Sequence, residues 1–224
     1  FNGRNSIRVS SNNPLAGFDS VRSASGTQAG ARALTVTPDV TLPTEVTVAG
    51  MIGNNSADDA GNFGGSVGVT TSTSGFDLLR LQRRGGLETF NSFVADSSGV
   101  ESASGSRVAS DGAPNETVAY EYEIAIRYNP GVDNDQARIR FREDGETVWT
   151  NILTAGDVQG YVDLGYDVPT GFYVALLADA PNFATSVRFD DLIVSSSTVI
   201  PEPSSLGLLI FGLLCISTIQ HRTS

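Results

Sequence analysis

The sequence predicts an all-β fold in which two antiparallel sheets pack face to face. In residues 1–195, short apolar segments are separated by glycine and small polar clusters, and no long apolar stripe has the helical period. About ten short strands are expected, which is more than one open sheet holds comfortably. A two-sheet sandwich or a closed barrel would bury them, and we favour the sandwich.

The clearest strand covers residues 118–128, where apolar and polar side chains alternate with a period of two. After a turn at 129–135 the alternation resumes, with apolar residues on one face and arginines on the other. One face carries Val118, Tyr120, Tyr122, Ile124, Ile126 and Tyr128 in the first strand, and Ala137, Ile139 and Phe141 in the second. The two segments therefore predict a hairpin with an apolar inner face and an outer face bearing Arg138, Arg140 and Arg142.

The register of this hairpin follows from its apolar and charged residues together. Opposed residues share a face, so the isoleucines of one strand must meet the apolar side chains of the other. Two neighbouring registers satisfy this rule, and one of them sets Arg127 against Arg138. We predict the other, in which Ile124 opposes Ile139 and Glu123 opposes Arg140, because opposite charges then face each other.

The remaining strands are expected in segments rich in β-branched and aromatic residues between turn signals. They are 45–52, 65–71, 77–82, 90–95, 147–152, 160–164, 171–178 and 185–194. Segments 61–65, 96–111 and 129–135 are then expected to be loops.

The composition excludes some classes of binding partner and some kinds of catalytic or metal site. The chain has 14 basic and 25 acidic residues. The resulting net charge of -11 and the pI near 4.4 argue against a nucleic-acid partner. The single cysteine, Cys215, and the single histidine, His221, both follow residue 204. The body is therefore expected to contain no disulfide, no histidine metal site and no histidine-based triad.

The composition changes at residue 195, and the sequence predicts four parts. The β-sandwich domain covers 1–195, a linker with a Pro-Glu-Pro motif covers 196–203, an apolar helix covers 204–219, and a short basic tail covers 220–224. At about 1.5 Å per residue, that helix would span roughly 24 Å, somewhat less than the ~30 Å hydrocarbon core of a bilayer. We predict a transmembrane helix that anchors the chain weakly.

The order of Pro201, Glu202 and Pro203, an apolar helix and a basic end resembles the PEP-CTERM sorting signal of Gram-negative bacteria. The resemblance covers about the last 26 residues, and it departs from the family in its single terminal arginine, Arg222. It implies an exosortase-type membrane protease as a partner and an inner-membrane anchor before processing. An exported protein that reaches the cell surface or extracellular matrix is then expected, and the start at Phe1 suits a fragment or a processed end.

The segment from Val187 to Val194, with the sequence VRFDDLIV, is similar to the last strand of concanavalin-like or laminin-G-like jelly rolls. The resemblance implies a jelly-roll-like sandwich with a carbohydrate-binding or matrix-binding role, and in some members a structural calcium ion.

Two groups of residues are candidates for ligand contacts. Asp133, Asn134 and Asp135 form an oxygen-rich loop of the kind that binds calcium, although turns favour the same residues. Trp149 alternates with Asn151, which places both on the polar face, where Trp149 would serve as a platform for a sugar ring. The alternative for Trp149 is an ordinary core position.

The residues do not indicate a catalytic site, and we assign no catalytic residue. Glu121 and Glu123 share a strand face, as the carboxylates of a glycosidase do, but arginines on the next strand explain them as charge partners. We therefore expect a non-enzymatic, exported protein of the cell surface or exopolysaccharide that binds polysaccharide. The alternative is a glycan-active hydrolase or lyase on the same jelly-roll fold.

Overall fold

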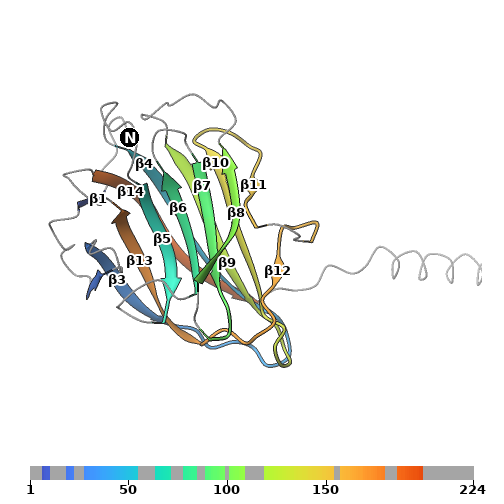
Figure 1. Cartoon of the computed structure of the whole chain (residues 1–224). Coiled ribbons are helices and arrows are strands. Elements are labelled where there is room, and N and C mark those ends of the chain that lie inside the picture. The colour runs from blue at the N-terminus through green and yellow to red at the C-terminus, as the bar shows by residue number, and fades with distance from the viewer. Residues whose placement is uncertain are drawn as a thin grey trace, which may run out of the picture.

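The computed structural model describes the chain in ten segments. These are residues 7–10, 19–22, 28–54, 64–71, 78–84, 89–98, 101–108, 119–153, 157–179 and 186–198. The described residues contain β-strands and no helix, and the strands are arranged in two layers (Figure 1). The predicted all-β, two-sheet antiparallel class is confirmed for this part of the chain.

The first sheet carries the candidate site described below. Its order is β1 (Ile7–Ser10), β14 (Ser186–Thr198), β4 (Thr44–Asn54), β9 (Tyr120–Tyr128), β10 (Gln136–Glu143) and β11 (Thr150–Asn151), and β12 (Val162–Asp163) also pairs with β10. The second sheet has the order β2 (Asp19–Arg22), β3 (Gln28–Thr35), β13 (Gly171–Asp179), β5 (Gly64–Thr70), β6 (Leu79–Arg84), β7 (Thr89–Ala95) and β8 (Glu101–Val108). Some strands that lie next to each other in a sheet, such as β14 and β4, are far apart in the sequence. The topology therefore depends on pairing between distant segments.

The core lies between the sheets and is made by alternate residues of their strands. Ile124 and Ile139 of the first sheet and Leu81 and Leu176 of the second are all completely buried. An aromatic cluster joins the layers, because the Phe90 ring of β7 stacks on the Phe141 ring of β10 with 4.0 Å between centroids. Burial of this apolar surface is the main favourable contribution to folding.

The β9–β10 hairpin has the predicted register. Ile124 opposes Ile139, Glu123 opposes Arg140 and Glu121 opposes Arg142. The isoleucines are buried and the arginines lie on the outer face, so the prediction from alternation and charge is confirmed.

One predicted loop was wrong, because 96–111 contains β8, which pairs with β7. Its residues are mainly Ser, Ala and Gly, which are typical of loops, and only the ladder to β7 makes the segment a strand. The same reasoning missed β3, which pairs with β2 and β13. The strands number fourteen in the described residues.

Strand β14 extends to Thr198, which pairs with Thr44 of β4, so three residues of the predicted linker continue the sheet. The Pro-Glu-Pro motif, the predicted helix 204–219 and the tail 220–224 lie outside the described residues. Within the described ranges, none of the elements is a helix with the length and apolar character needed to span a membrane.

Candidate functional site

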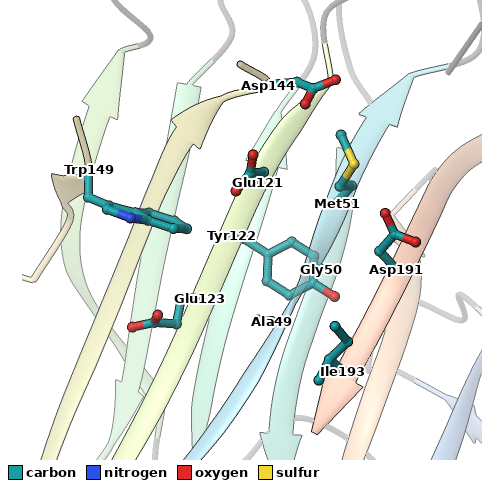
Figure 2. A pocket seen from close by; sticks show the side chains of 10 residues that line it. All are labelled: Ala49, Gly50, Met51, Glu121, Tyr122, Glu123, Asp144, Trp149, Asp191 and Ile193. Atoms are coloured by element: carbon teal, nitrogen blue, oxygen red, sulfur yellow. The ribbon is translucent and has the colours of Figure 1, made fainter. Parts of the chain in front are cut away.

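A groove of about 260 Å³ lies on the face of the first sheet that points away from the core (Figure 2). Four segments distant in sequence form it: β4, β9, the region after β10, and β14. Its lining residues are Ala49, Gly50, Met51, Glu121, Tyr122, Glu123, Asp144, Trp149, Asp191 and Ile193.

A β-bulge in β14 shapes one side of the groove. Asp190 pairs with Met51 and Ile193 pairs with Ala49, so two residues of β14 oppose the single residue Gly50. Asp191 in the bulge has a φ of 50°, and its backbone N–H donates to Oδ1 of Asp190 at 2.9 Å. The bulge therefore gives the exposed Asp191 a different direction from that of a regular strand residue.

Ion pairs hold the two glutamates of β9. Glu123 accepts from Nη2 of Arg138 at 2.6 Å and from Nη2 of Arg140 at 2.7 Å, one guanidinium for each oxygen. Glu121 accepts from Nε of Arg142 at 2.9 Å. The predicted Glu–Arg partnership is therefore present, and it fixes both carboxylates against their own sheet.

Trp149 lies on the outer face at the groove, half-buried, and not in the core. The guanidinium carbons of Arg140 and Arg142 each lie 4.5 Å from its ring centroid. These cation–π contacts help to position the ring, and Figure 2 shows it extending over the sheet toward Glu121 and Glu123.

Asn151 shares this face, because it pairs with Arg140 in the β10–β11 ladder. It lies against Gly160, where an added Cβ would be 2.4 Å from the Asn151 side chain. Its Oδ1 is buried and has no hydrogen-bond partner among the described residues. Asn151 does not line the groove that Trp149 borders.

A second aromatic–arginine cluster continues the same face, and the sequence reasoning missed it. The Tyr161 ring lies 3.8 Å from the guanidinium carbon of Arg127 and 4.4 Å from that of Arg138. Its hydroxyl donates to Glu45, which also pairs with Arg127 at 3.3 Å. Burial raises the pKa of the Tyr161 hydroxyl well above its usual range, so it stays a donor. Tyr161 is isolated in a short segment, and no pattern in the sequence brings it to β9 and β10.

The loop proposed for calcium is held by hydrogen bonds within the protein. Asp135 is buried, and its carboxylate oxygens accept the backbone N–H groups of Asn129 and Val168, each at 2.8 Å. Burial raises the pKa of the Asp135 carboxyl, and the two hydrogen bonds oppose that rise. Asp135 therefore ties the β9–β10 loop to the segment before β13.

The other two residues of that loop have separate partners. Asp133 has a φ of 53° and its N–H donates to Asp167, while the Asn134 side chain donates to the carbonyl of Pro130. Among the residues that the structure describes, no group of three or more His, Cys, Asp or Glu side chains is arranged to hold a metal ion. Turn chemistry accounts for these contacts, and calcium binding by Asp133, Asn134 and Asp135 stays a prediction.

Comparison with protein-family models gives no match, and comparison with curated proteins gives none either. Solved structures with a similar fold include lectins with a concanavalin-like jelly roll. Lectin I-B4 from Griffonia simplicifolia, in its metal-free form, has a TM-score of 0.50 at 10% identity, covering 86% of this chain and 93% of that one. Lectin UEA-II, solved in complex with galactose, has a TM-score of 0.51 at 7% identity, covering 86% and 87%.

Lectin II from Ulex europaeus is similar to the same extent, with a TM-score of 0.50 at 8% identity and coverage of 88% and 94%. At these identities the likeness establishes the fold alone, because one fold carries many unrelated functions. The chain thus has the lectin-like, two-sheet sandwich that the strand similarity at Val187–Val194 implied.

Proposed function

We propose that this is an exported, non-enzymatic protein of the cell surface or exopolysaccharide, and that its groove on the first sheet binds a glycan. The supporting observation is the partly exposed Trp149, which borders a groove that is also lined by carboxylates. The lectin-like fold adds support, since sugar-binding proteins share it.

The chemistry of the groove suits a sugar. The apolar face of a pyranose packs on an aromatic ring, and its hydroxyls donate to carboxylate oxygens. Trp149 supplies the ring, and Asp144 and Asp191 are exposed carboxylates on the same groove. Arg140 and Arg142 hold the ring in place, which lowers the entropy lost when a ligand binds.

Binding by the full chain can be measured by isothermal titration calorimetry with neutral polysaccharides. Trp149→Ala is expected to weaken binding at least tenfold, because the ring face is lost. Trp149→Phe keeps an aromatic ring and is expected to retain most of the affinity. Equal affinity in the wild type and the alanine variant would exclude this groove as the binding site.

The sorting part of the proposal is supported by Pro201, Glu202 and Pro203 before the apolar segment 204–219. An exosortase-type protease and the inner membrane are then the partners of this end. Intact-mass analysis of the secreted protein is expected to find a loss of the segment after the motif. A secreted chain that retains all of residues 204–224 would contradict this route.

A glycan-active hydrolase or lyase is the second candidate, because Glu121 and Glu123 lie on the groove. A general acid must give up a proton, whereas both oxygens of Glu123 accept from guanidinium groups. This arrangement favours binding over catalysis. Release of reducing ends or unsaturated sugars from a bound polysaccharide would favour the enzyme.

A further inference from the structure

We propose that the end of the sandwich at which β14 finishes faces a lipid bilayer, and that the groove lies on the half of the domain away from it. This inference rests on the proposed membrane anchoring by residues 204–219, and it adds an orientation and a second contact surface. Three exposed apolar side chains in two loops, Val40, Leu42 and Val132, make the contact with lipid.

The two loops lie beside the last residue of β14. Thr198 pairs with Thr44 of β4, and Thr44 pairs in turn with Tyr128 of β9. Loop 36–43 ends directly before Thr44 and loop 129–135 begins directly after Tyr128, so both leave the same edge of the first sheet. Figure 1 shows them together at the lower edge of the sandwich. We refer to these two loops and Thr198 as the exit end of the domain.

The exit end exposes apolar side chains to solvent. Val40 is 88% exposed, Val132 is 78% exposed, and Leu42 in the same loop as Val40 is 37% exposed. Side chains of this type are usually buried, and several exposed together mark a surface that contacts a protein or a membrane. A bilayer is favoured here because the uncharged, apolar segment 206–219 follows the same end of the domain.

The connection between the sheet and the apolar segment is short. Residues 199–203 separate Thr198 from the predicted helix, and they reach at most roughly 20 Å. When that helix inserts, the exit end therefore stays at the membrane surface, where a short tether gives an effective concentration on the order of mM. A contact too weak to hold an untethered domain on a bilayer is then formed.

Hydrogen bonds hold both loops in place. Oδ1 of Asp39 accepts from the backbone N–H of Thr41 at 2.7 Å, and the backbone N–H of Asp39 donates to Oγ1 of Thr44 at 2.8 Å. In the other loop, the buried carboxylate of Asp135 accepts from the backbone N–H of Asn129 at 2.8 Å. A surface that is already ordered loses less entropy when it binds.

The groove lies toward the opposite end of the first sheet. Glu121, which lines it, is seven residues from Tyr128 along β9, and this separation corresponds to roughly 24 Å. Asp144, which also lines the groove, directly follows the end of β10 that pairs with Tyr120. A polysaccharide outside the membrane can therefore reach Trp149 while the exit end remains in contact with lipid.

The test uses the full chain in vesicles of phosphatidylcholine, which carry no net charge, so that apolar contact is measured. Cys215→Ala removes the single cysteine, and either Val132→Cys or Val148→Cys then gives one site for an environment-sensitive fluorophore. Val148 is the matched control, because it is 74% exposed and lies between Asp144 and Trp149 of the groove. A quencher carried by the lipid headgroups is expected to quench the label at position 132 at least threefold more than the label at position 148, because apolar side chains of surface-bound segments enter the headgroup region.

A second pair of variants tests whether the exposed valines make the contact. Val40→Asp is expected to reduce the quenching at position 132 by about half, because a charge opposes entry of the loop into the interface, and Val148→Asp should leave it unchanged. Equal effects of the two aspartate substitutions would overturn the role of the valines.

Flotation of the vesicles separates failure of the orientation from failure of the anchor. Equal quenching of the two labels, on chains that float with the vesicles, would overturn the orientation and leave the proposed anchoring intact. Chains that do not float with the vesicles would show that the anchoring itself fails, and the inference with it.

Discussion

The hydroxyl of Tyr122 lies 2.7 Å from the position that a Cβ on Gly50 would occupy. The two residues are paired across β4 and β9, and the absence of a side chain on Gly50 leaves space for the tyrosine ring beside the bulge of β14. The ring is completely buried, and its hydroxyl has no hydrogen-bond partner among the described residues. This contact joins the core to the groove on the other face, because both residues also line that groove.

Tyr122→Phe is expected to raise the free energy of unfolding by about 1 kcal/mol, since a buried hydroxyl without a partner costs about 1–3 kcal/mol. Urea unfolding followed by fluorescence measures the change. Tyr128→Phe is the matched control, because the Tyr128 hydroxyl donates to the carbonyl of Pro169 at 3.1 Å. The free energy of unfolding of that variant should fall by about 1 kcal/mol. A fall for Tyr122→Phe as large as the fall for Tyr128→Phe would contradict the conclusion that the Tyr122 hydroxyl lacks a partner among the described residues.

Gly50→Ala is expected to lower the free energy of unfolding by about 1–3 kcal/mol, as overpacking of a core does. The new methyl would meet the Tyr122 hydroxyl and also the backbone carbonyl oxygen of Asp190, at 2.9 Å, which moves less easily. Gly171→Ala is the control, because nothing lies within 4 Å of an added Cβ there. A Gly50→Ala variant as stable as the control would indicate that the bulge can move aside.

Stability should fall at alkaline pH because of three tyrosines. Burial raises the pKa of Tyr122, Tyr128 and Tyr161 well above their usual range. In the unfolded chain these hydroxyls lose protons near pH 10, while the folded chain keeps them. The free energy of unfolding is then at its full value below pH 10 and decreases as the pH rises above it. Urea unfolding between pH 9 and 11 measures the slope, which Tyr122→Phe should reduce.

Glu123→Gln is expected to lower the free energy of unfolding by about 1–2 kcal/mol, because Arg138 and Arg140 lose the carboxylate that they share. Glu121→Gln breaks only the pair with Arg142, where Glu121 is 28% exposed, and should cost less than about 1 kcal/mol. Thermal unfolding at low and high salt compares the two variants. A larger loss of unfolding free energy for Glu121→Gln than for Glu123→Gln would contradict the expectation that the more buried ion pairs contribute more to stability.

Asp135→Asn is expected to lower the free energy of unfolding by roughly 2 kcal/mol. An amide offers only one acceptor oxygen, so the N–H of either Asn129 or Val168 loses its partner. Asp133→Asn changes an exposed residue of the same loop and serves as the control. Calcium added to the wild-type chain and its removal by a chelator, each followed by thermal unfolding, test the calcium prediction separately.

The β9–β10 hairpin could be predicted from the sequence because its information is local. Alternation of Ile124 and Ile126 with charged residues places one face inward, and a short turn limits the registers to neighbouring ones. By contrast, β8 lacks such alternation, and its Ser, Ala and Gly residues become a strand only by pairing with β7. Local patterns therefore failed where small polar residues form the sheet.

The sequence by itself determined the all-β class, the outward face of the arginines and their partnership with Glu121 and Glu123, since alternation and opposite charge act between near neighbours. Only the tertiary structure decided the groove. Gly50, Asp191 and Trp149 line one groove because β14, β4, β9 and β10 lie side by side, and that order depends on the pairing of β14 with β4, which are more than a hundred residues apart, and of β4 with β9. The bulge that exposes Asp191 arises from the same pairing, because two residues of β14 must fit against the single Gly50 of β4.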